Sequence, residues 1–389
     1  MNCDQASLSS IRSEVDDYWH RVLSLCHQRN PFHFGMEFPS KAFNEFEYLD
    51  SGTYSHVIKA IEHQGGTPII KVVQRTTLSR MSDIPISGFE LYLDVYQEIV
   101  IMKMLSNLHD NVSDIAGYEY QTHSFPRIFR SRVVHGEIPN YFLIRKYDET
   151  IPKIKKVDRF DDTFGVPREY LVVVMKFGGD SLWDRIQSFS KDKLLPDQII
   201  SLCYQTILAL AVSEQVLQFE HRDLHICNML VKETKKKEVH FKIRSVDYYV
   251  KSFSIKACII DTTFSRMAVA GVIHYTDLSS RLKSSTENPK PEEHEIVYAD
   301  MYRLVADRWT EWFPQTNVQW LRYCFKELST CSVFEEFAEE HHKNIMKNLI
   351  DLIENQKTVF DFVKTLFKSG DNPSERLYRE TPNNMQNEF

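Results

Sequence analysis

The stretch FEHRDLHICNML, residues 219–230, governs how the rest of the chain is interpreted. It holds Asp223 and Asn228 five positions apart on a segment whose flanks are apolar. Leu224, Ile226 and Met229 are suited to anchoring such a polar loop to a core. A carboxylate can orient and deprotonate a hydroxyl, and an amide oxygen suits a hard cation such as Mg²⁺. The stretch therefore predicts an active-site loop.

Hydrophobic patterns on either side of this loop differ in kind. Before it, short apolar runs broken by turn residues predict three antiparallel strands over 46–73, and a further strand covers 170–175. A helix is expected at 91–108, where apolar residues recur every three or four positions. Beyond residue 180 the longer period predicts helices at 196–219, 295–312, 318–328 and 334–366. We expect an α+β fold with a β-rich lobe followed by a mainly helical lobe.

Domain boundaries follow from the same patterns. We predict an N-terminal helical leader at 1–45, a first lobe and hinge at 46–179, a second lobe at 180–368 and a disordered polar tail at 369–389. The leader has apolar residues at helical spacing and is expected to pack on the lobe behind it.

The loop resembles the catalytic loop of protein kinases, in which His-Arg-Asp is followed five residues later by Asn. Phosphoryl transfer needs positioning and charge neutralisation rather than covalent chemistry, which suits this pair of side chains. Asp223 would accept the proton of the attacking hydroxyl, and Asn228 would bind magnesium. His221 is expected to satisfy buried backbone groups.

Three further residues fit this interpretation. Lys71 lies in IIKVV, where kinases place the lysine that contacts the nucleotide phosphates, and Glu98 lies on the predicted helix where its partner is expected. Each sits in an apolar stretch in which an unpaired charge would be costly, so we predict that they pair. Asp261 ends the buried run ACII, where a second magnesium ligand belongs, although it could instead cap the following turn.

Departures from the usual kinase motifs point to one family. Asp261 is followed by Thr-Thr rather than Phe-Gly, and no Ala-Pro-Glu follows. HRDLH with its second histidine, His225, together with IIDTTFSRM, YADMYRL and NVQWLRY, resembles haspin, an atypical kinase that phosphorylates a threonine near the end of a histone tail. The resemblance covers most of residues 46–330 and includes a long insertion between Asn228 and Asp261.

The resemblance implies a nucleotide site with ATP and Mg²⁺ as cofactors. Lys176, Phe177 and Gly178 would form the hinge, with backbone groups near Lys176 and Gly178 binding adenine. Gly52 and Val57 remain from the glycine-rich loop. Asp50 and Ser55 replace its outer glycines, which predicts weaker nucleotide binding.

The resemblance also implies a protein substrate, with a histone tail and a role in mitosis as the family expectation. Asp277 falls where the family places an acidic residue that recognises basic side chains, and Asp300 would receive backbone donors from the catalytic loop. Arg281 and Lys283 stand where further carboxylates are expected, so the preference for basic peptides is predicted to be weak.

Composition bounds the partners and the compartment. The net charge is -7, and the basic run at 232–242 is interpreted as a solvated hairpin tip, so we expect no direct nucleic-acid binding. Seven scattered cysteines without a CxxC pair favour a reducing compartment, the nucleus or the cytoplasm. No apolar run is long enough to cross a membrane, and a monomer is expected.

Two other functions stay open on the sequence. A pseudokinase would keep the fold while the altered glycine-rich loop, with Asp50 and Ser55, abolishes turnover. A small-molecule phosphotransferase also uses a His-x-Asp loop with a downstream Asn and Asp, but Arg222 and YADMYRL argue against it.

Overall fold

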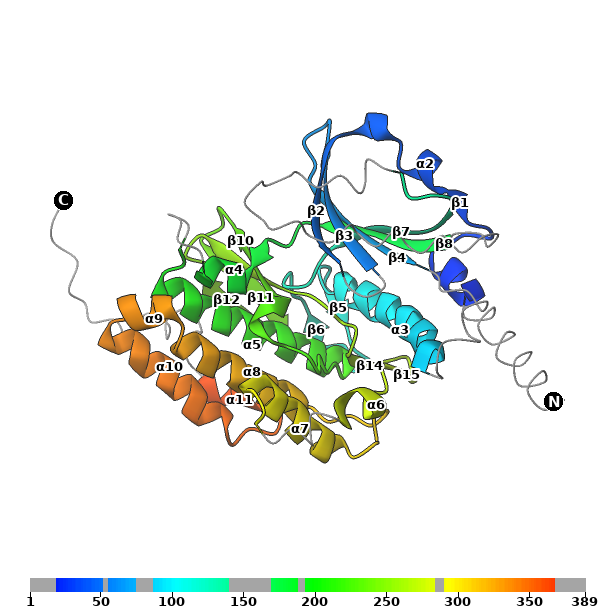
Figure 1. Cartoon of the computed structure of the whole chain (residues 1–389). Coiled ribbons are helices and arrows are strands. Elements are labelled where there is room, and N and C mark those ends of the chain that lie inside the picture. The colour runs from blue at the N-terminus through cyan, green and yellow to red at the C-terminus, as the bar shows by residue number, and fades with distance from the viewer. Residues whose placement is uncertain are drawn as a thin grey trace, which may run out of the picture. The chain divides into compact units, whose positions relative to one another are not determined.

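The computed structural model describes residues 19–51, 55–74, 87–139, 169–187, 193–283 and 290–367, in two units (Figure 1). The first unit comprises Met1–Tyr96 and Ile128–Phe177, and the second comprises Gln97–Arg127 and Gly178–Phe389. The break after Phe177 adjoins the predicted hinge. The contacts place Gln97–Arg127 with the second unit, whereas we expected this segment in the first lobe. Gly52, the first part of the leader and the tail at 369–389 lie outside the described residues.

The first unit is built on a six-stranded sheet with the strand order β1-β7-β8-β4-β3-β2. The predicted hairpins are confirmed, and the second turns at Gly65, whose φ of 85° suits glycine. The strand β7 was not predicted, because arginines and a serine interrupt its apolar pattern. The six strands are β1 (Phe32–His33), β2 (Phe43–Ser51), β3 (Ser55–Glu62), β4 (Pro68–Gln74), β7 (Ile128–His135) and β8 (Glu169–Lys176).

One face of this sheet carries the core of the first unit. Alternate residues such as Ile58, Ile70 and Val172 are fully buried there, together with the aromatic rings of Phe34 and Phe38 from and beside the short helix α2 (Phe34–Glu37). Because successive strand residues point to opposite faces, the neighbours of these residues along the strands line the other face. That second face carries the predicted nucleotide-binding side chains.

The described part of the leader packs within the first unit, as expected. Residues 19–25 are helical, and Trp19, Val22 and Cys26 are buried. Gln28 then pairs with the backbone of Val133 on β7, accepting its N–H at 2.7 Å and donating to its carbonyl at 3.0 Å. The leader is thereby attached to a strand more than 100 residues away in sequence.

The second unit is organised around the helix α5 (Pro196–Leu217) (Figure 1). Strands β11 and β13 contact it, as do the C-terminal helices. Pro196 suits the first helical position, where its missing N–H is not needed, and Gln218 ends the helix in the left-handed conformation. Contrary to our expectation that no apolar stretch is long enough to cross a membrane, this helix is long and apolar enough by composition alone, but 83% of that stretch is buried inside the protein. It is the core helix of this unit.

The remaining helices lie at the predicted positions, with two corrections. The helix expected at 295–312 ends at Val305, because Ala306 takes the left-handed conformation that ends helices. The single helical stretch expected at 334–366 is three helices, α9, α10 and α11. The α+β class is confirmed by a sheet-based first unit and a mainly helical second unit. The helices are α3 (Ser87–Asn107), which crosses from one unit to the other, and α4 (Leu182–Gln187), α6 (Ser279–Leu282), α7 (Glu293–Val305), α8 (Gln315–Ser329), α9 (Ser332–Phe337), α10 (Glu340–Ile353) and α11 (Val359–Leu366).

Short strands in the second unit carry the loop singled out in the sequence. The insertion after Asn228 is a nested pair of antiparallel ladders, β10 with β13 and β11 with β12. The lysines at 235–237 of the basic run lie in the exposed turn between β10 and β11, so the solvated turn is confirmed. This turn is not a hairpin tip, because β10 pairs with β13 and β11 with β12. The strands of this unit are β5 (Val112–Ser113), β6 (Glu119–Tyr120), β9 (Asp180–Ser181), β10 (Met229–Glu233), β11 (Glu238–Ile243), β12 (Val246–Lys251), β13 (Ile255–Ile259), β14 (Arg266–Val269) and β15 (Val272–Tyr275).

Candidate active site

The β10–β13 ladder brings Asn228 and Asp261 together in space. Met229 opens β10 opposite Ile259, which closes β13. The pairing continues one step further, where Ile260 donates its N–H to the Asn228 carbonyl at 3.0 Å. Since the strands are antiparallel, the residue before β10 and the residues after β13 lie at the same end. The two predicted magnesium ligands are therefore neighbours, although 33 positions (261 minus 228) separate them in sequence.

Asp223 is largely buried beside this end of the ladder. Its Oδ1 accepts a hydrogen bond from the phenol of Tyr298 on α7. Burial has the largest effect on the pKa of Asp223 and raises it, the Tyr298 hydrogen bond lowers it, and the nearby Asp261 carboxylate raises it, so that together they bring the pKa to about 7. A carboxyl group with a pKa near neutrality is matched to general-base work at physiological pH.

Asn228 presents an oxygen to the site because its amide nitrogen is already used. Its Nδ2 donates to the Asp223 carbonyl at 2.9 Å and lies 3.2 Å from His225 Nε2. Within the described chain the hydrogen bonds of this side chain are all made by Nδ2 and none by Oδ1, although the residue is buried. An amide oxygen held in this way is a ligand type that Mg²⁺ accepts.

Asp261 takes part in the turn that follows β13. Its backbone has a φ of 63°, and its Oδ1 accepts from both the backbone N–H and the hydroxyl of Thr263, at 3.2 and 2.6 Å. The turn-capping role weighed for this residue is therefore present. Capping occupies one carboxylate oxygen and fixes the side chain, which is compatible with metal binding through the carboxylate.

His221 holds the catalytic loop to its surroundings through three hydrogen bonds. The ring Nε2 is 2.9 Å from the Ile260 carbonyl. The backbone N–H of His221 donates to Asn317 Oδ1 at 2.9 Å, and its backbone carbonyl accepts from Ser265 Oγ at 3.1 Å. Burial lowers the pKa of His221 to about 4, so the ring is neutral and donates through Nε2 to the carbonyl. The expected structural role of His221 is confirmed.

Arg222 is fully buried and belongs to the scaffold. Its Nε donates to Glu220 Oε2 at 3.0 Å, and one terminal nitrogen donates to the Trp309 carbonyl at 3.1 Å. The guanidinium also lies 5.4 Å from the Trp309 ring. Glu220 is held in turn by the Phe313 N–H and by a backbone pairing with Arg266. A buried arginine paired in this way is costly to disrupt.

Within the described chain the Asp300 carboxylate accepts no hydrogen bond from the backbone of the catalytic loop, which corrects our expectation. Its side chain is exposed and pairs with Arg303 one turn along α7, at 2.8 Å. Asn317 on α8 takes the role instead, since it accepts the His221 N–H and also donates to the Phe219 carbonyl at 2.8 Å. A helical position three residues from an arginine favours the local ion pair over a distant contact.

Predicted nucleotide-site residues of the first unit share one sheet face. Val57 on β3 lies opposite Lys71 on β4, which in turn lies opposite Val173 on β8. This face is the one that does not carry the core cluster. Phe177 lies under the ammonium of Lys59 at 4.9 Å, and Lys176 is exposed.

Glu98 is partly buried and lies on α3, in the part of the helix that belongs to the second unit, directly before the buried residues Ile99 and Val100. Lys71 belongs to the first unit, and the pairing of these two residues remains a prediction.

The predicted hinge glycine leads into closely packed backbone. A Cβ atom on Gly178 would lie 2.8 Å from Leu230 Cδ1 and 2.9 Å from Cys258 Sγ. Gly179 has a φ of 121° and approaches the Val231 carbonyl so closely that a Cβ there would lie 2.2 Å from its oxygen. Glycine is therefore needed at 179, where φ is positive and the neighbouring atoms are backbone, whereas the atoms facing Gly178 belong to side chains.

Asp277 is exposed, as a substrate-binding residue should be, but its Oδ1 also accepts the Ser279 N–H at 2.9 Å at the start of α6. Arg281 lies over the Phe264 ring at 5.5 Å.

Other carboxylates gather beside the catalytic loop, among them Asp184 on α4 and Glu327 on α8. Both raise the pKa of the Cys227 thiol, after the larger effect of its burial.

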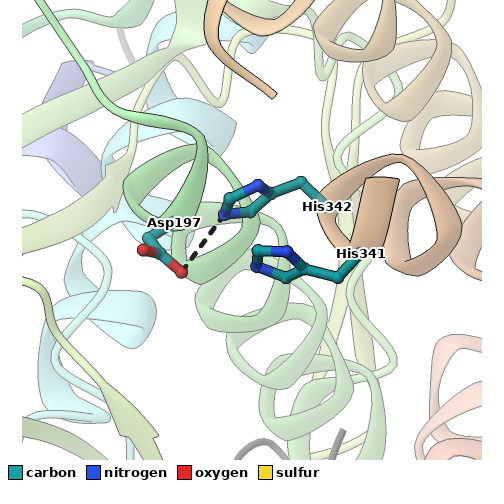
Figure 2. A group of neighbouring side chains, drawn as sticks. All are labelled: Asp197, His341 and His342. Atoms are coloured by element: carbon teal, nitrogen blue, oxygen red, sulfur yellow. Dashed lines mark ion pairs between the residues drawn. The ribbon is translucent and has the colours of Figure 1, made fainter. Parts of the chain in front are cut away.

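A separate cluster joins the first turns of α5 and α10 (Figure 2). Asp197 Oδ1 lies 3.5 Å from His342 Nε2, and the rings of His341 and His342 stack with centroids 3.7 Å apart. These residue types can bind a metal, but His342 Nδ1 accepts the Glu339 N–H at 3.1 Å. A neutral imidazole that accepts at Nδ1 carries its proton on Nε2, so it presents an N–H to Asp197 rather than a lone pair. The cluster links two helices.

Sequence reasoning missed Tyr298 and Asn317 as functional residues. Both lie in segments that carried the family resemblance, YADMYRL and NVQWLRY, but neither was given a role. The signal for Asn317 was its place on the apolar face of an amphipathic helix, three and four positions before Trp320 and Leu321, where a buried polar group needs partners. No local pattern marks Tyr298, since aromatic residues are ordinary core residues on such helices.

Comparison with known proteins gives concordant matches. A family model described as the haspin like kinase domain matches residues 3–372. The serine/threonine-protein kinase haspin homolog of Drosophila melanogaster is 26% identical over 346 residues, covering 86% of this chain and 57% of that protein. Serine/threonine-protein kinase haspin of Mus musculus is 25% identical over 347 residues, covering 87% and 43%. The chain spans about half the length of these two relatives.

Proposed function

The chain belongs to the haspin-like kinase family, and on this premise we propose that it is a protein serine/threonine kinase that uses ATP and Mg²⁺. The observation that carries the proposal is the end of the β10–β13 ladder, where Asn228 and Asp261 lie close together in space and the loop places the Asp223 carboxylate beside them. A base and two oxygen ligands in one place are the parts that phosphoryl transfer needs.

In this mechanism Asp223 orients the substrate hydroxyl and accepts its proton as the oxygen attacks the γ-phosphorus of ATP, while the bond from that phosphorus to the bridging oxygen breaks and ADP leaves. Burial and the neighbouring carboxylate keep the pKa of Asp223 near 7, so a useful fraction is ionised at neutral pH and the group remains a competent base. The hydrogen bond from Asn228 Nδ2 to the Asp223 carbonyl fixes the loop around the base.

The donor set supports magnesium at this end of the ladder. Asn228 Oδ1 and the Asp261 carboxylate would hold the ion, and both are hard oxygen ligands. When bound, Mg²⁺ neutralises charge on the phosphates. Lys71 and Val57, on the sheet face opposite the core of the first unit, are suited to the phosphates and to the adenine respectively.

A protein substrate with a basic segment, such as a histone tail, is the finer part of the proposal. Support comes from the carboxylates Asp184, Glu293 and Glu327 around the catalytic loop, where burial and Glu293 both raise the pKa of Glu327. A local concentration of negative charge attracts and orients basic side chains. A role in mitosis and a nuclear or cytoplasmic location follow the family and are part of the same proposal.

Activation without phosphorylation of the chain is also proposed. In kinases regulated in that way an arginine can receive the phosphate. Here Arg222 is fully buried between Glu220 and Trp309, so it offers no surface to such a group.

The test is transfer of radiolabelled phosphate from ATP to histones, to a generic basic protein and to aminoglycosides. Asp223→Asn should lower the rate by about 10²- to 10⁴-fold, because the base is lost while the side chain keeps its shape. Asp300→Asn, the same change at an exposed position of α7, is the control and should leave the rate unchanged. If the aminoglycosides are labelled and the two protein acceptors are not, the chain is a small-molecule kinase and the proposal is wrong. If no acceptor is labelled, the result favours a pseudokinase.

A further inference from the structure

The phenol of Tyr298 occupies one of the two oxygens of the proposed catalytic base. It donates to Asp223 Oδ1, and His225 Nε2 lies 3.8 Å from the same oxygen. Within the described chain Oδ2 of Asp223 makes no hydrogen bond, and 14% of the side chain is exposed. The two oxygens of this carboxylate are therefore in different environments.

Tyr298 is held in place by an aromatic cluster. Its ring meets the fully buried Trp320 edge to face, with centroids 5.0 Å apart, and Phe264 lies 6.5 Å away. Trp320 also lies 6.5 Å from the ring of His225 in the catalytic loop. Edge-to-face pairs of this kind fix ring orientation. The hydroxyl is thus presented to Asp223 by packing between α7, α8 and the loop.

We propose that Tyr298 is a positioning residue for phosphoryl transfer, which anchors Oδ1 of Asp223 and leaves Oδ2 as the oxygen that receives the proton of the substrate hydroxyl. The inference rests on the proposed kinase function. An aspartate side chain has two rotatable bonds, so its carboxylate can turn away from the acceptor, and small misplacements of a catalytic group reduce rates strongly. One hydrogen bond to Oδ1 stops this rotation without blocking Oδ2.

The structure offers a matched control for the variant that removes the hydroxyl. Tyr323 on α8 packs edge to face on the same Trp320, with centroids 5.7 Å apart, and it makes no hydrogen bond within the described chain. Tyr298→Phe and Tyr323→Phe each remove one oxygen from a ring packed on the same tryptophan. Only the first should affect the chemistry.

The experiment measures kcat and KM for ATP and for a phosphorylatable peptide in the parent, in both Phe variants, in Asp223→Ala and in the double variant Tyr298→Phe with Asp223→Ala. We expect Tyr298→Phe to lower kcat about 10-fold while KM for ATP changes less than 2-fold. Tyr323→Phe should match the parent. The residual rate of Asp223→Ala should not fall further in the double variant, because the hydroxyl acts only through the carboxylate.

Thermal unfolding of the same variants gives a readout that does not depend on turnover. Tyr298→Phe should lower the melting temperature of the parent by a few degrees and leave that of Asp223→Ala unchanged. If the parent is active and Tyr298→Phe leaves kcat unchanged, or if both Phe variants lose the same activity, the positioning role of Tyr298 is wrong while the proposed kinase function stands. A parent that labels no acceptor overturns the proposed function and the positioning role with it.

Discussion

Asn317 Oδ1 accepts the backbone N–H of His221 at 2.9 Å, across 96 positions of sequence. The same side chain donates to the Phe219 carbonyl at 2.8 Å and to Glu214 Oε1 at 3.0 Å. One fully buried amide on α8 therefore joins the start of the catalytic loop to the core helix α5.

Replacing this amide should destabilise the protein. Asn317→Ala leaves the His221 N–H and the Phe219 carbonyl buried without partners, which we expect to lower the free energy of unfolding by about 3 kcal/mol or more. Chemical denaturation measures the loss, and Asn344→Ala at an exposed position of α10 is the control. A loss below about 1 kcal/mol would show that water or a rearranged loop replaces the amide.

Magnesium should be required for tight ATP binding. We expect ATP with Mg²⁺ to raise the melting temperature of the parent, whereas ATP with EDTA gives little stabilisation, because the carboxylate at Asp261 otherwise repels the phosphates. Asp261→Ala should lose most of the magnesium-dependent shift. Thr263→Ala removes only the hydroxyl that binds Asp261 and should retain it in large part. Equal shifts with and without Mg²⁺ would exclude this ligand assignment.

Glu214 should make stability depend on pH. It accepts hydrogen bonds from Asn317 and from the Val359 and Phe360 N–H groups at the start of α11, but burial raises its pKa to about 8. An unfolded carboxyl group titrates near 4.5, so between 4.5 and 8 the folded chain binds more protons at this site. This contribution to the free energy of unfolding is therefore present at acid pH and declines as pH rises through about 8.

The measurement for Glu214 is the slope of unfolding free energy against pH between 5 and 8. The glutamine of Glu214→Gln cannot ionise, so the free energy of unfolding of this variant should fall less between pH 5 and 8 than that of the parent. This comparison of slopes holds even if weaker hydrogen bonds make the variant less stable at every pH. Glu340→Gln, on the exposed side of α10, should keep the parental slope. Parallel slopes for the parent and Glu214→Gln would mean that Glu214 is ionised throughout.

Recognition of basic peptides should depend on Glu327. The measured quantity is the ratio of kcat/KM for paired peptides with arginine or alanine beside the target threonine. Glu327→Gln should lower this ratio about 10-fold, since a charge-assisted hydrogen bond contributes about 1.5 to 3 kcal/mol. Arg281→Glu should raise the ratio, because it replaces a positive charge that repels the peptide arginine with a carboxylate. If Glu327→Gln leaves the ratio unchanged, Glu327 does not recognise the peptide arginine and the recognition surface lies elsewhere than on α8.

The sequence by itself determined the elements with a strong local pattern. The catalytic-loop motif, the strand that carries Lys71 and the position of Asp261 after a buried run are each encoded within about ten residues. Alternation and helical periodicity are local properties, so the three strands from 46 to 73 and the long helix from 196 were predictable. The close approach of Asn228 and Asp261 was expected from the motif, and the antiparallel pairing of β10 with β13 supplies its physical cause.

Only the tertiary structure decided which distant side chains complete the site. Tyr298 reaches Asp223 across 75 positions and Asn317 reaches His221 across 96, and no spacing rule connects such pairs. Asp300 and Tyr298 lie two positions apart on α7, and the rotation of that helix leaves the first exposed while the second faces the base. Helix rotation is set by packing against Trp320 and its neighbours, because burial of the whole apolar face outweighs the preference of any single polar residue.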